Sequence, residues 1–171
     1  MKTELKPNQV LFAKINDNAI IPTKRDEDAG YDLYTTNRDQ LVILSPHQTE
    51  EFPTGIASAF HPSKVALFKE RGSTGKIGIG QRSGVMDSGY RGEWIVLLTN
   101  HNDYPLYFVP DNAYEAYIKI YPKQQVYNLN KAIAQAVFLD LPQMKTSEVT
   151  PNELMEYKSE RMTGRYASTK K

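Results

Sequence analysis

The chain has 171 residues, which is enough for one domain with a hydrophobic core and an appended arm. Its 21 Lys and Arg and 20 Asp and Glu give a net charge of +1, which argues against a nucleic-acid polymer or an anionic membrane as a partner. The absence of Cys excludes a disulfide framework, a thiolate zinc site and a cysteine nucleophile. No stretch approaches the roughly eighteen apolar residues of a membrane span, so we expect a cytoplasmic protein without a membrane partner.

Short β-branched and aromatic runs, punctuated by ten Gly and ten Pro, dominate the first part of the chain. Runs of this length, bounded by turn residues, are typical of an all-β sandwich or barrel. The runs that we interpret as strands are VLFAKI at 10–15, YDLYTT at 31–36, LVIL at 41–44, VALFK at 65–69, EWIVLLT at 93–99, PLYFV at 105–109, AYIKIY at 116–121 and AQAVFL at 134–139.

The stretch DEDAGYDLY at 26–34 contains several acids, and Asp32 alone among them lies inside a predicted strand. The acids at 26–28 are interpreted as a solvated turn. An inward carboxylate at Asp32 needs a partner. A hard cation such as Mg²⁺, held through water, is one such partner.

The stretch RGSTGKIGIG at 71–80 is rich in Gly, and its backbone N–H groups suit an anion. The spacing does not match a Walker-type loop, because Glu70 and Ile77 occupy the positions that such a loop requires. Arg71 and Ser73 with neighbouring amides form a candidate site for phosphate oxygens. A plain Gly-rich loop is the alternative, and the residues alone leave both open.

The stretch RSGVMDSGYRGEW at 82–94 predicts a hairpin, because Ser88 and Gly89 form a turn dipeptide. Taken alone, Asp87 is interpreted as a turn acid and Tyr90 as a packing aromatic.

The strand pattern ends after residue 141, and the polar segment 142–171 forms an appended arm. Thr150 and Glu153 form a capping box around a Pro, which predicts a short helix over about 151–158. The rest of the arm is too polar to bury by itself. It is therefore either disordered or ordered by packing on another subunit or a ligand.

Five stretches, in order and covering the chain nearly end to end, resemble the five motifs of the homotrimeric dUTPase family. The match at 84–93 is the most specific. The five stretches are AGYDLYT at 29–35, RGSTG at 71–75, GVMDSGYRGE at 84–93, AIAQAV at 132–137 and RMTGRYAST at 161–169.

The resemblance implies a distorted jelly-roll barrel over 1–141 and an arm over 142–171 that closes as a lid over the active site. It implies hydrolysis of dUTP to dUMP and pyrophosphate with Mg²⁺ as cofactor. It also implies a homotrimer whose three active sites form between chains. If the chain is encoded by a phage, the cytoplasm is that of a bacterial host.

The resemblance also implies the roles of individual residues. Asp87 activates the attacking water, and Gln135 contacts the α-phosphate or helps to place that water. Asp32 orients the waters around Mg²⁺. The implied substrate-binding residues are Arg71, Gly72, Ser73, Gln81, Gly84, Val85, Met86, Tyr90, Arg161, Tyr166, Ser168 and Thr169.

Within that set, the backbone of Val85 and Met86 reads uracil, and Tyr90 excludes a ribose 2′-hydroxyl. Tyr166 stacks over uracil, and Arg161 clamps the γ-phosphate.

The chain departs from the family pattern at several positions. A Gly separates Arg71 from Ser73, where the family more often has Ser directly after Arg. Ala132 replaces the usual Arg of the fourth motif. In the fifth motif, Tyr166 replaces Phe, and residues 167 and 170 are Ala and Lys instead of Gly.

Between the third and fourth motifs the chain carries roughly twenty residues more than compact family members, and insertions of that size tend to be functional or disordered. This insert, about 100–128, is rich in Tyr, which favours an ordered surface. It resembles the insert of phage-encoded dUTPases. We expect it to be a recognition surface for a regulatory protein, separate from catalysis.

The sequence leaves two alternative functions. A dCTP deaminase relative resembles this chain in fold, but its reaction needs a Glu on the strand after the hairpin, and residues 94–98 contain no acid. A jelly-roll regulatory or binding protein that acts through the Tyr-rich insert is the second alternative.

Overall fold

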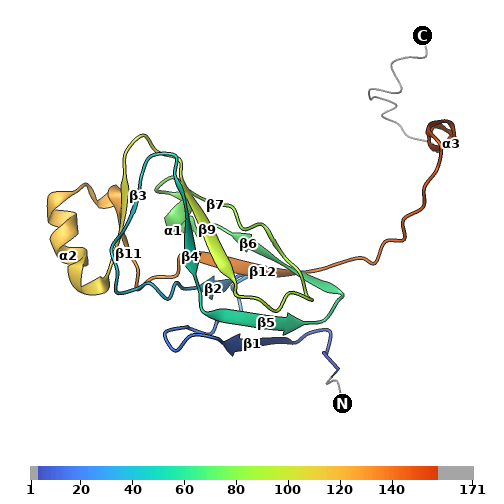
Figure 1. Ribbon diagram of the computed structural model, residues 1–171, viewed down its shortest axis with the longest axis horizontal. Coiled ribbons are helices and arrows are strands. Elements are labelled where there is room, and N and C mark those ends of the chain that lie inside the picture. The colour runs from blue at the N-terminus through green and yellow to red at the C-terminus, as the bar shows by residue number, and fades with distance from the viewer. Residues whose placement is uncertain (1–3, 158–171) are drawn as a thin grey trace, which may run out of the picture. The chain divides into compact units, whose positions relative to one another are not determined.

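A computed structural model describes residues 4–157, and the chain divides into two units, Met1–Leu141 and Pro142–Lys171. The first unit consists mainly of short strands (Figure 1). They are β1 (Val10–Lys14), β2 (Tyr31–Leu33), β3 (Val42–Leu44), β4 (Thr49–Pro53), β5 (Ile56–Phe60), β6 (Lys64–Lys69), β7 (Ile79–Gln81), β8 (Val85–Met86), β9 (Ile95–Asn100), β10 (Leu106–Val109), β11 (Val126–Asn128) and β12 (Ala134–Asp140).

Hydrogen bonds group these strands into four sheets, with the orders β1-β5, β11-β10-β3, β2-β12-β6-β8 and β4-β9-β7. β10 and β11 run parallel, and the other paired strands are antiparallel. Small antiparallel sheets of this kind are characteristic of jelly-roll architectures. Every predicted strand run except 116–121 overlaps a strand of the structure, so the all-β prediction is confirmed for most of the unit.

The strand prediction for 116–121 is wrong, because these residues belong to the helix α2 (Asp111–Ile120) and the residue that follows it. Its partly buried side chains lie at spacings of three and four and are Ala113, Tyr114, Tyr117 and Ile118. That spacing marks one face of a helix, which the apolar run alone did not reveal.

The predicted insert, about 100–128, contributes β10, α2 and β11, and β10 also pairs with β3. The insert is therefore part of the folded unit, and α2 lies beside β11 in Figure 1. A short 3₁₀ turn, η1 (Lys123–Gln125), connects α2 to β11. The insert side chains that enter the core are Leu106, Phe108, Val109, Val126 and Tyr127.

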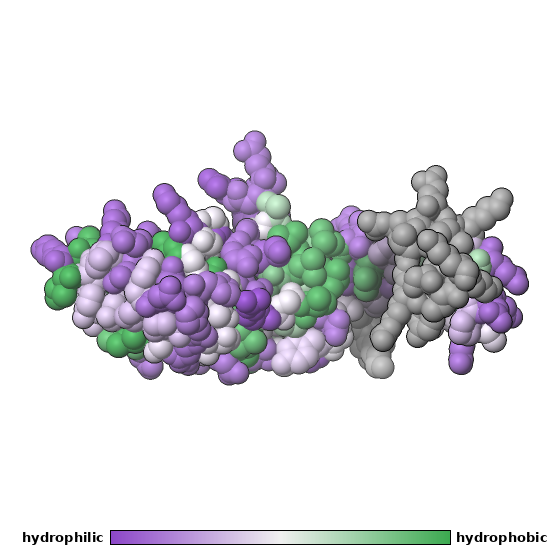
Figure 2. All heavy atoms as spheres, turned by 90° about the horizontal axis from the view of Figure 1, so that it is seen from above, coloured by the Kyte–Doolittle hydropathy of each residue, from purple (hydrophilic) through white to green (hydrophobic). Residues whose placement is uncertain are grey.

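One face of the sheet β2-β12-β6-β8 carries five apolar side chains that alternate along the strands with core residues. The register pairs Val137 with Leu67, Leu67 with Val85, and Leu139 with Val65, so all five share that face. We call these five residues the outer face. Val85 is 61% exposed and Leu139 is 45% exposed. Figure 2 shows hydrophobic groups among hydrophilic ones on the surface that it displays.

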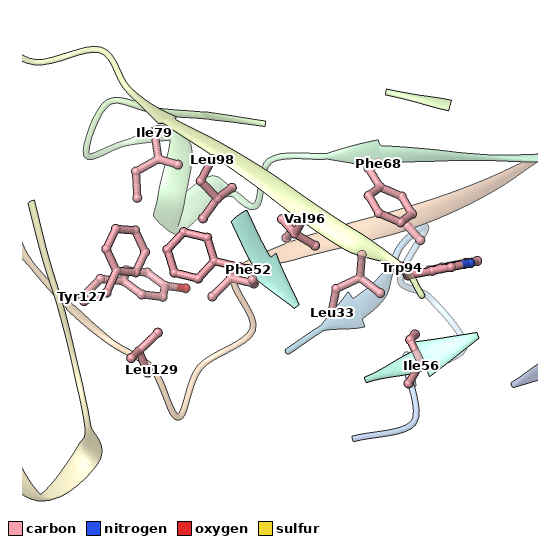
Figure 3. Close-up of a cluster of buried hydrophobic side chains, with 14 of the residues drawn as sticks. Leu33, Phe52, Ile56, Phe68, Ile79, Trp94, Val96, Leu98, Tyr127 and Leu129 are labelled. Carbon is pink, nitrogen blue, oxygen red and sulfur yellow. The ribbon is translucent and has the colours of Figure 1, made fainter. Parts of the chain in front are cut away.

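The core is a continuous cluster of buried apolar side chains that links the sheets. Trp94 is fully buried and packs against Phe68, with ring centroids 5.0 Å apart. Figure 3 shows these two rings at one end of the cluster and Tyr127 with Leu129 at the other. Burying a large apolar side chain contributes roughly 1.5–3 kcal/mol, so this cluster fixes the strands that carry the site.

In the second unit, the helix α3 spans Pro151–Glu156, as the sequence predicts, although it ends two residues earlier. The Thr150 hydroxyl accepts a hydrogen bond from the Glu153 N–H at 3.3 Å, and the Glu153 carboxylate accepts one from the Thr150 N–H at 2.7 Å. This is the predicted capping box. Across the part of the chain that the structure describes, no helix is long and apolar enough to cross a membrane.

Candidate active site

The predicted phosphate-binding residues line one open cleft of about 870 Å³ in the first unit. We call it the Arg71 cleft. β2, β12 and the short helix α1 (Gly72–Gly75) contribute its walls, together with the loop before β2. The predicted site residues that line it are Asp32, Arg71, Gly72, Ser73 and Gln135.

Asp32 and Arg71, which both line this cleft, form an ion pair. The Arg71 Nε atom lies 3.0 Å from Asp32 Oδ1, and its Nη2 atom donates to Asp32 Oδ2 at 3.3 Å. The two-point geometry fixes the plane of the guanidinium. The sequence predicts that Asp32 needs a partner, and Arg71 is one.

Gln135 lies opposite Asp32 in the antiparallel pair of β12 and β2. Its Nε2 atom donates to the Glu70 carbonyl at 2.8 Å, which orients the amide toward the cleft. The amide packs directly on Gly30, where a Cβ atom would overlap the Gln135 Oε1 atom. Gly30 is therefore required for this placement of Gln135.

The start of α1 holds Arg71 through a side chain that the motif analysis did not single out. The buried Thr74 hydroxyl accepts from the Arg71 N–H at 3.0 Å and donates to the Arg71 carbonyl at 3.0 Å. Ser73 is exposed beside it. Thr74 thus supports the backbone of Arg71 while Ser73 faces the cleft.

Three further cations line the Arg71 cleft and were missed by the sequence analysis, namely Lys24, Arg25 and Lys131. Arg25 pairs with Asp28 at 2.9 Å. The Lys131 ammonium lies 5.9 Å from the centre of the Tyr114 ring on α2. No motif marks these cations, since only the fold brings them to the cleft.

A Mg²⁺ ion at this cleft would have few direct protein ligands. Among residues 4–157, no group of three or more His, Asp or Glu side chains is placed to hold a metal. Mg²⁺ commonly keeps several waters and binds through one or two carboxylates and substrate phosphates. The Asp32 carboxylate, whose two oxygens also face Arg71, is the predicted group that would hold such an ion through water.

Asp87 and Tyr90 line a second cleft of about 300 Å³, which we call the Asp87 cleft. Asp87 is exposed, and within residues 4–157 its carboxylate has no hydrogen bond or ion pair. The cleft is lined by Glu51, Ser83, Val85, Met86, Asp87, Tyr90, Glu93, Ile95 and Leu97. The predicted site residues that line a cleft are thus divided between two separate clefts of a single chain, and Gly84 lines neither.

The predicted hairpin at 82–94 needs a correction. The Tyr90 N–H donates to the Asp87 carbonyl at 3.1 Å, so the turn exists, but β8 pairs with β6 instead of with the strand after the turn. The strand after the turn, β9, pairs with β7 and β4. Residues 84–94 therefore form a long connection, the Asp87 loop, in which Val85 and Met86 are the strand β8 and pair with β6.

The Asp87 loop is held by several polar contacts. Gly84 adopts a φ of +71°, which favours Gly, and its carbonyl accepts from the Phe68 N–H at 2.9 Å. The Arg91 Nη1 atom donates to the Ser88 carbonyl at 2.7 Å. The Glu93 carboxylate accepts from the Gly55 N–H at 2.7 Å.

The remaining predicted site residues lie elsewhere. Gln81 is not among the lining residues of either cleft. With its amide oriented to satisfy its neighbours, it donates to the Phe68 carbonyl at 3.0 Å and accepts from the Ser83 hydroxyl at 2.8 Å. The predicted residues of the arm lie outside the described residues, namely Arg161, Tyr166, Ser168 and Thr169.

Comparison with known proteins identifies the family. The dUTPase family model matches residues 16–113. A deoxyuridine 5′-triphosphate nucleotidohydrolase of Gloeobacter violaceus is 31% identical, with 96% of this chain and 99% of that protein aligned. The chain belongs to the dUTPase family. The predicted family is therefore confirmed.

Solved structures of phage dUTPases share the fold. A dUTPase mutant of Staphylococcus bacteriophage 80alpha with dUpNHpp has a TM-score of 0.64 and 19% identity, and 90% of this chain and 94% of that chain align. A dUTPase mutant of phage phi11 of S. aureus, described with a structural Mg(II) ion, has a TM-score of 0.64 and 20% identity over 85% of this chain and 99% of that chain. The predicted dUTPase-like fold is confirmed.

Proposed function

We propose that the chain hydrolyses dUTP to dUMP and pyrophosphate, with Asp87 activating the water that attacks the α-phosphorus. Membership of the dUTPase family along nearly the whole chain is the observation that carries this proposal. The exposed Asp87 carboxylate supports it, because a general base must be free to accept a proton from water.

The Asp87 cleft binds the nucleoside. The backbone of Val85 and Met86 offers uracil a fixed pattern of donors and acceptors, which discriminates against cytosine. Tyr90 contacts the deoxyribose and excludes a 2′-hydroxyl. Its ring lies over Gly92, where an added Cβ atom would overlap the Tyr90 hydroxyl oxygen, so Gly92 leaves room for the ring.

The Arg71 cleft binds the phosphates. Arg71 and Ser73 contact phosphate oxygens, and Gln135 places the α-phosphate or the attacking water. Asp32 orients the waters of Mg²⁺. When bound, this ion neutralises charge on the triphosphate.

The arm completes the site as a lid. Arg161 clamps the γ-phosphate and Tyr166 stacks on uracil, while Ser168 and Thr169 add polar contacts. Closure of such a segment excludes water from the reaction and aligns the phosphate chain.

The active molecule is a homotrimer in this proposal. The nucleoside residues and the phosphate residues lie in two clefts of one chain, so a neighbouring chain can unite them. The outer face supports the same conclusion, because an exposed contiguous apolar face is typical of a subunit contact.

A panel of nucleotides tests the proposed reaction. The pure protein is incubated with Mg²⁺ and dUTP, dTTP, dCTP or UTP, and pyrophosphate and deaminated product are quantified. We expect pyrophosphate from dUTP alone. Deaminated product from dCTP would instead support the deaminase alternative, and no reaction with dUTP would contradict the proposal.

We also propose that the insert binds a regulatory protein. Tyr107 and Tyr121 stack with ring centroids 4.1 Å apart, and Tyr117 lies 5.8 Å from Tyr121. Ile120 beside them is 72% exposed. Partly exposed aromatic side chains of this kind are enriched at protein interfaces.

A further inference from the structure

Tyr127 is a buried residue that no motif includes, and its hydroxyl reaches the phosphate end of the site. It lies on β11 and is 4% exposed, in the core cluster of Figure 3. Its hydroxyl donates to the Ala132 carbonyl at 2.6 Å. The core encloses the ring, and the Phe108 ring centroid lies 5.5 Å from that of Tyr127. Because the ring is packed in this way, the hydroxyl has a fixed position.

The same carbonyl binds Arg71. The Arg71 Nη1 atom donates to the Ala132 carbonyl at 3.2 Å, and a carbonyl oxygen has two lone pairs. Arg71 is therefore held on one side by Asp32 and on the other by a carbonyl that Tyr127 fixes. The side chain at Ala132 is a single methyl group, so this contact comes from the backbone.

We propose that Tyr127 is a positioning residue for the reaction, because it holds the Ala132 carbonyl and thereby orients the Arg71 guanidinium toward the phosphates. This inference rests on the proposed function, and it adds a residue that acts through Arg71 without contacting substrate. β11 ends the insert, so the insert helps to build the phosphate site.

The ionisation of Tyr127 is compatible with this role. Burial raises the pKa of Tyr127 above its usual value, and the nearby Ser73 and Arg71 oppose that effect only in part. The hydroxyl therefore keeps its proton at neutral pH and remains a donor to the Ala132 carbonyl.

Tyr127→Phe removes only the hydroxyl and keeps the ring. We expect the dissociation constant of a non-hydrolysable dUTP analogue, measured by calorimetry, to rise about 3- to 10-fold, as one lost hydrogen bond implies. Binding of deoxyuridine should not change, because the nucleoside lies in the other cleft. Tyr104→Phe is the matched control, since Tyr104 also packs on the core but its hydroxyl makes no hydrogen bond within residues 4–157.

A double-mutant cycle separates positioning from general destabilisation. In an Arg71→Lys background, Tyr127→Phe should add little further loss, because the two residues act as one unit. Equal losses in both backgrounds, or an equal loss for deoxyuridine, would overturn the proposal.

A measurement without nucleotide separates this inference from the proposed function. The Arg71 Nη1–H signals in nitrogen-15 NMR at low temperature, assigned with Arg71→Lys, should be protected from exchange in the wild type and lose that protection in Tyr127→Phe, because Nη1 is the atom that the Ala132 carbonyl holds. An unchanged signal would overturn the inference even if dUTP is hydrolysed. If Tyr127→Phe loses this protection from exchange but the wild type releases no pyrophosphate from dUTP, only the proposed function is contradicted.

Discussion

Arg71 remains able to bind phosphate although two groups of the chain already hold it. A guanidinium has five N–H donors. Asp32 engages Nε and Nη2, and the Ala132 carbonyl engages Nη1, so each η nitrogen keeps one N–H for the substrate. The guanidinium is thus oriented before the phosphates arrive, which lowers the entropy cost of binding them.

Substitution of Gly30 tests the placement of the Gln135 amide in the Arg71 cleft. Gly30→Ala places a methyl group against the Gln135 amide, so Gln135 must move. We expect turnover of dUTP to fall by up to about 100-fold, as small misplacements of catalytic groups can cause. Gly75→Ala is the control, since the nearest atom to its added Cβ is 3.9 Å away. Equal turnover of the two variants would contradict the placement of Gln135.

For the secondary-structure elements, the sequence predicts where the strands lie better than it predicts how the site residues are arranged. Alternation and β-branched content reveal β6 and β12, whereas Ala and Ser obscure β5 in the run IASAF. The aromatic run at 116–121 conceals the helix α2. The site is divided into two clefts because β8 and β9 pair in different sheets. Local sequence does not determine such long-range strand pairing.

The α2 surface gives a prediction that separates partner binding from catalysis. Tyr117→Ala combined with Ile120→Asp alters one partly buried and one exposed side chain, neither of which lines a cleft, so we expect turnover within about twofold, as is usual for substitutions away from a site. Any protein partner that binds the wild type should be lost, as judged by calorimetry with the purified partner. Ile15→Asp, at a comparably exposed site near β1, should retain that partner. If both variants retain the partner, the α2 surface is not the binding site for that partner.

The arm gives a second prediction at this scale. A chain that ends before Arg161 keeps the described strands but lacks the proposed lid, so we expect severely reduced turnover with an unchanged thermal midpoint. Wild-type turnover by this truncated protein would show that the arm is not a lid.

At the scale of the whole molecule, the outer face predicts assembly. Leu139→Asp adds a charge to an exposed position of that face, so the monomer should still fold but the subunits should separate. Light scattering should then report a mass near one 19.5 kDa chain instead of three, and turnover should be lost with the shared sites. Leu11→Asp is the control, at 43% exposure on β1. A wild-type protein that is a fully active monomer would refute this prediction.

In the proposed reaction, Asp87 activates water for the hydrolysis of dUTP. The most direct test measures pyrophosphate release from dUTP by wild type and Asp87→Asn, together with nucleotide binding. We expect release by the wild type, a loss of about 10²- to 10⁴-fold in the variant, and unchanged binding, because only the base is removed. Equal release by both proteins would show that Asp87 is not the base.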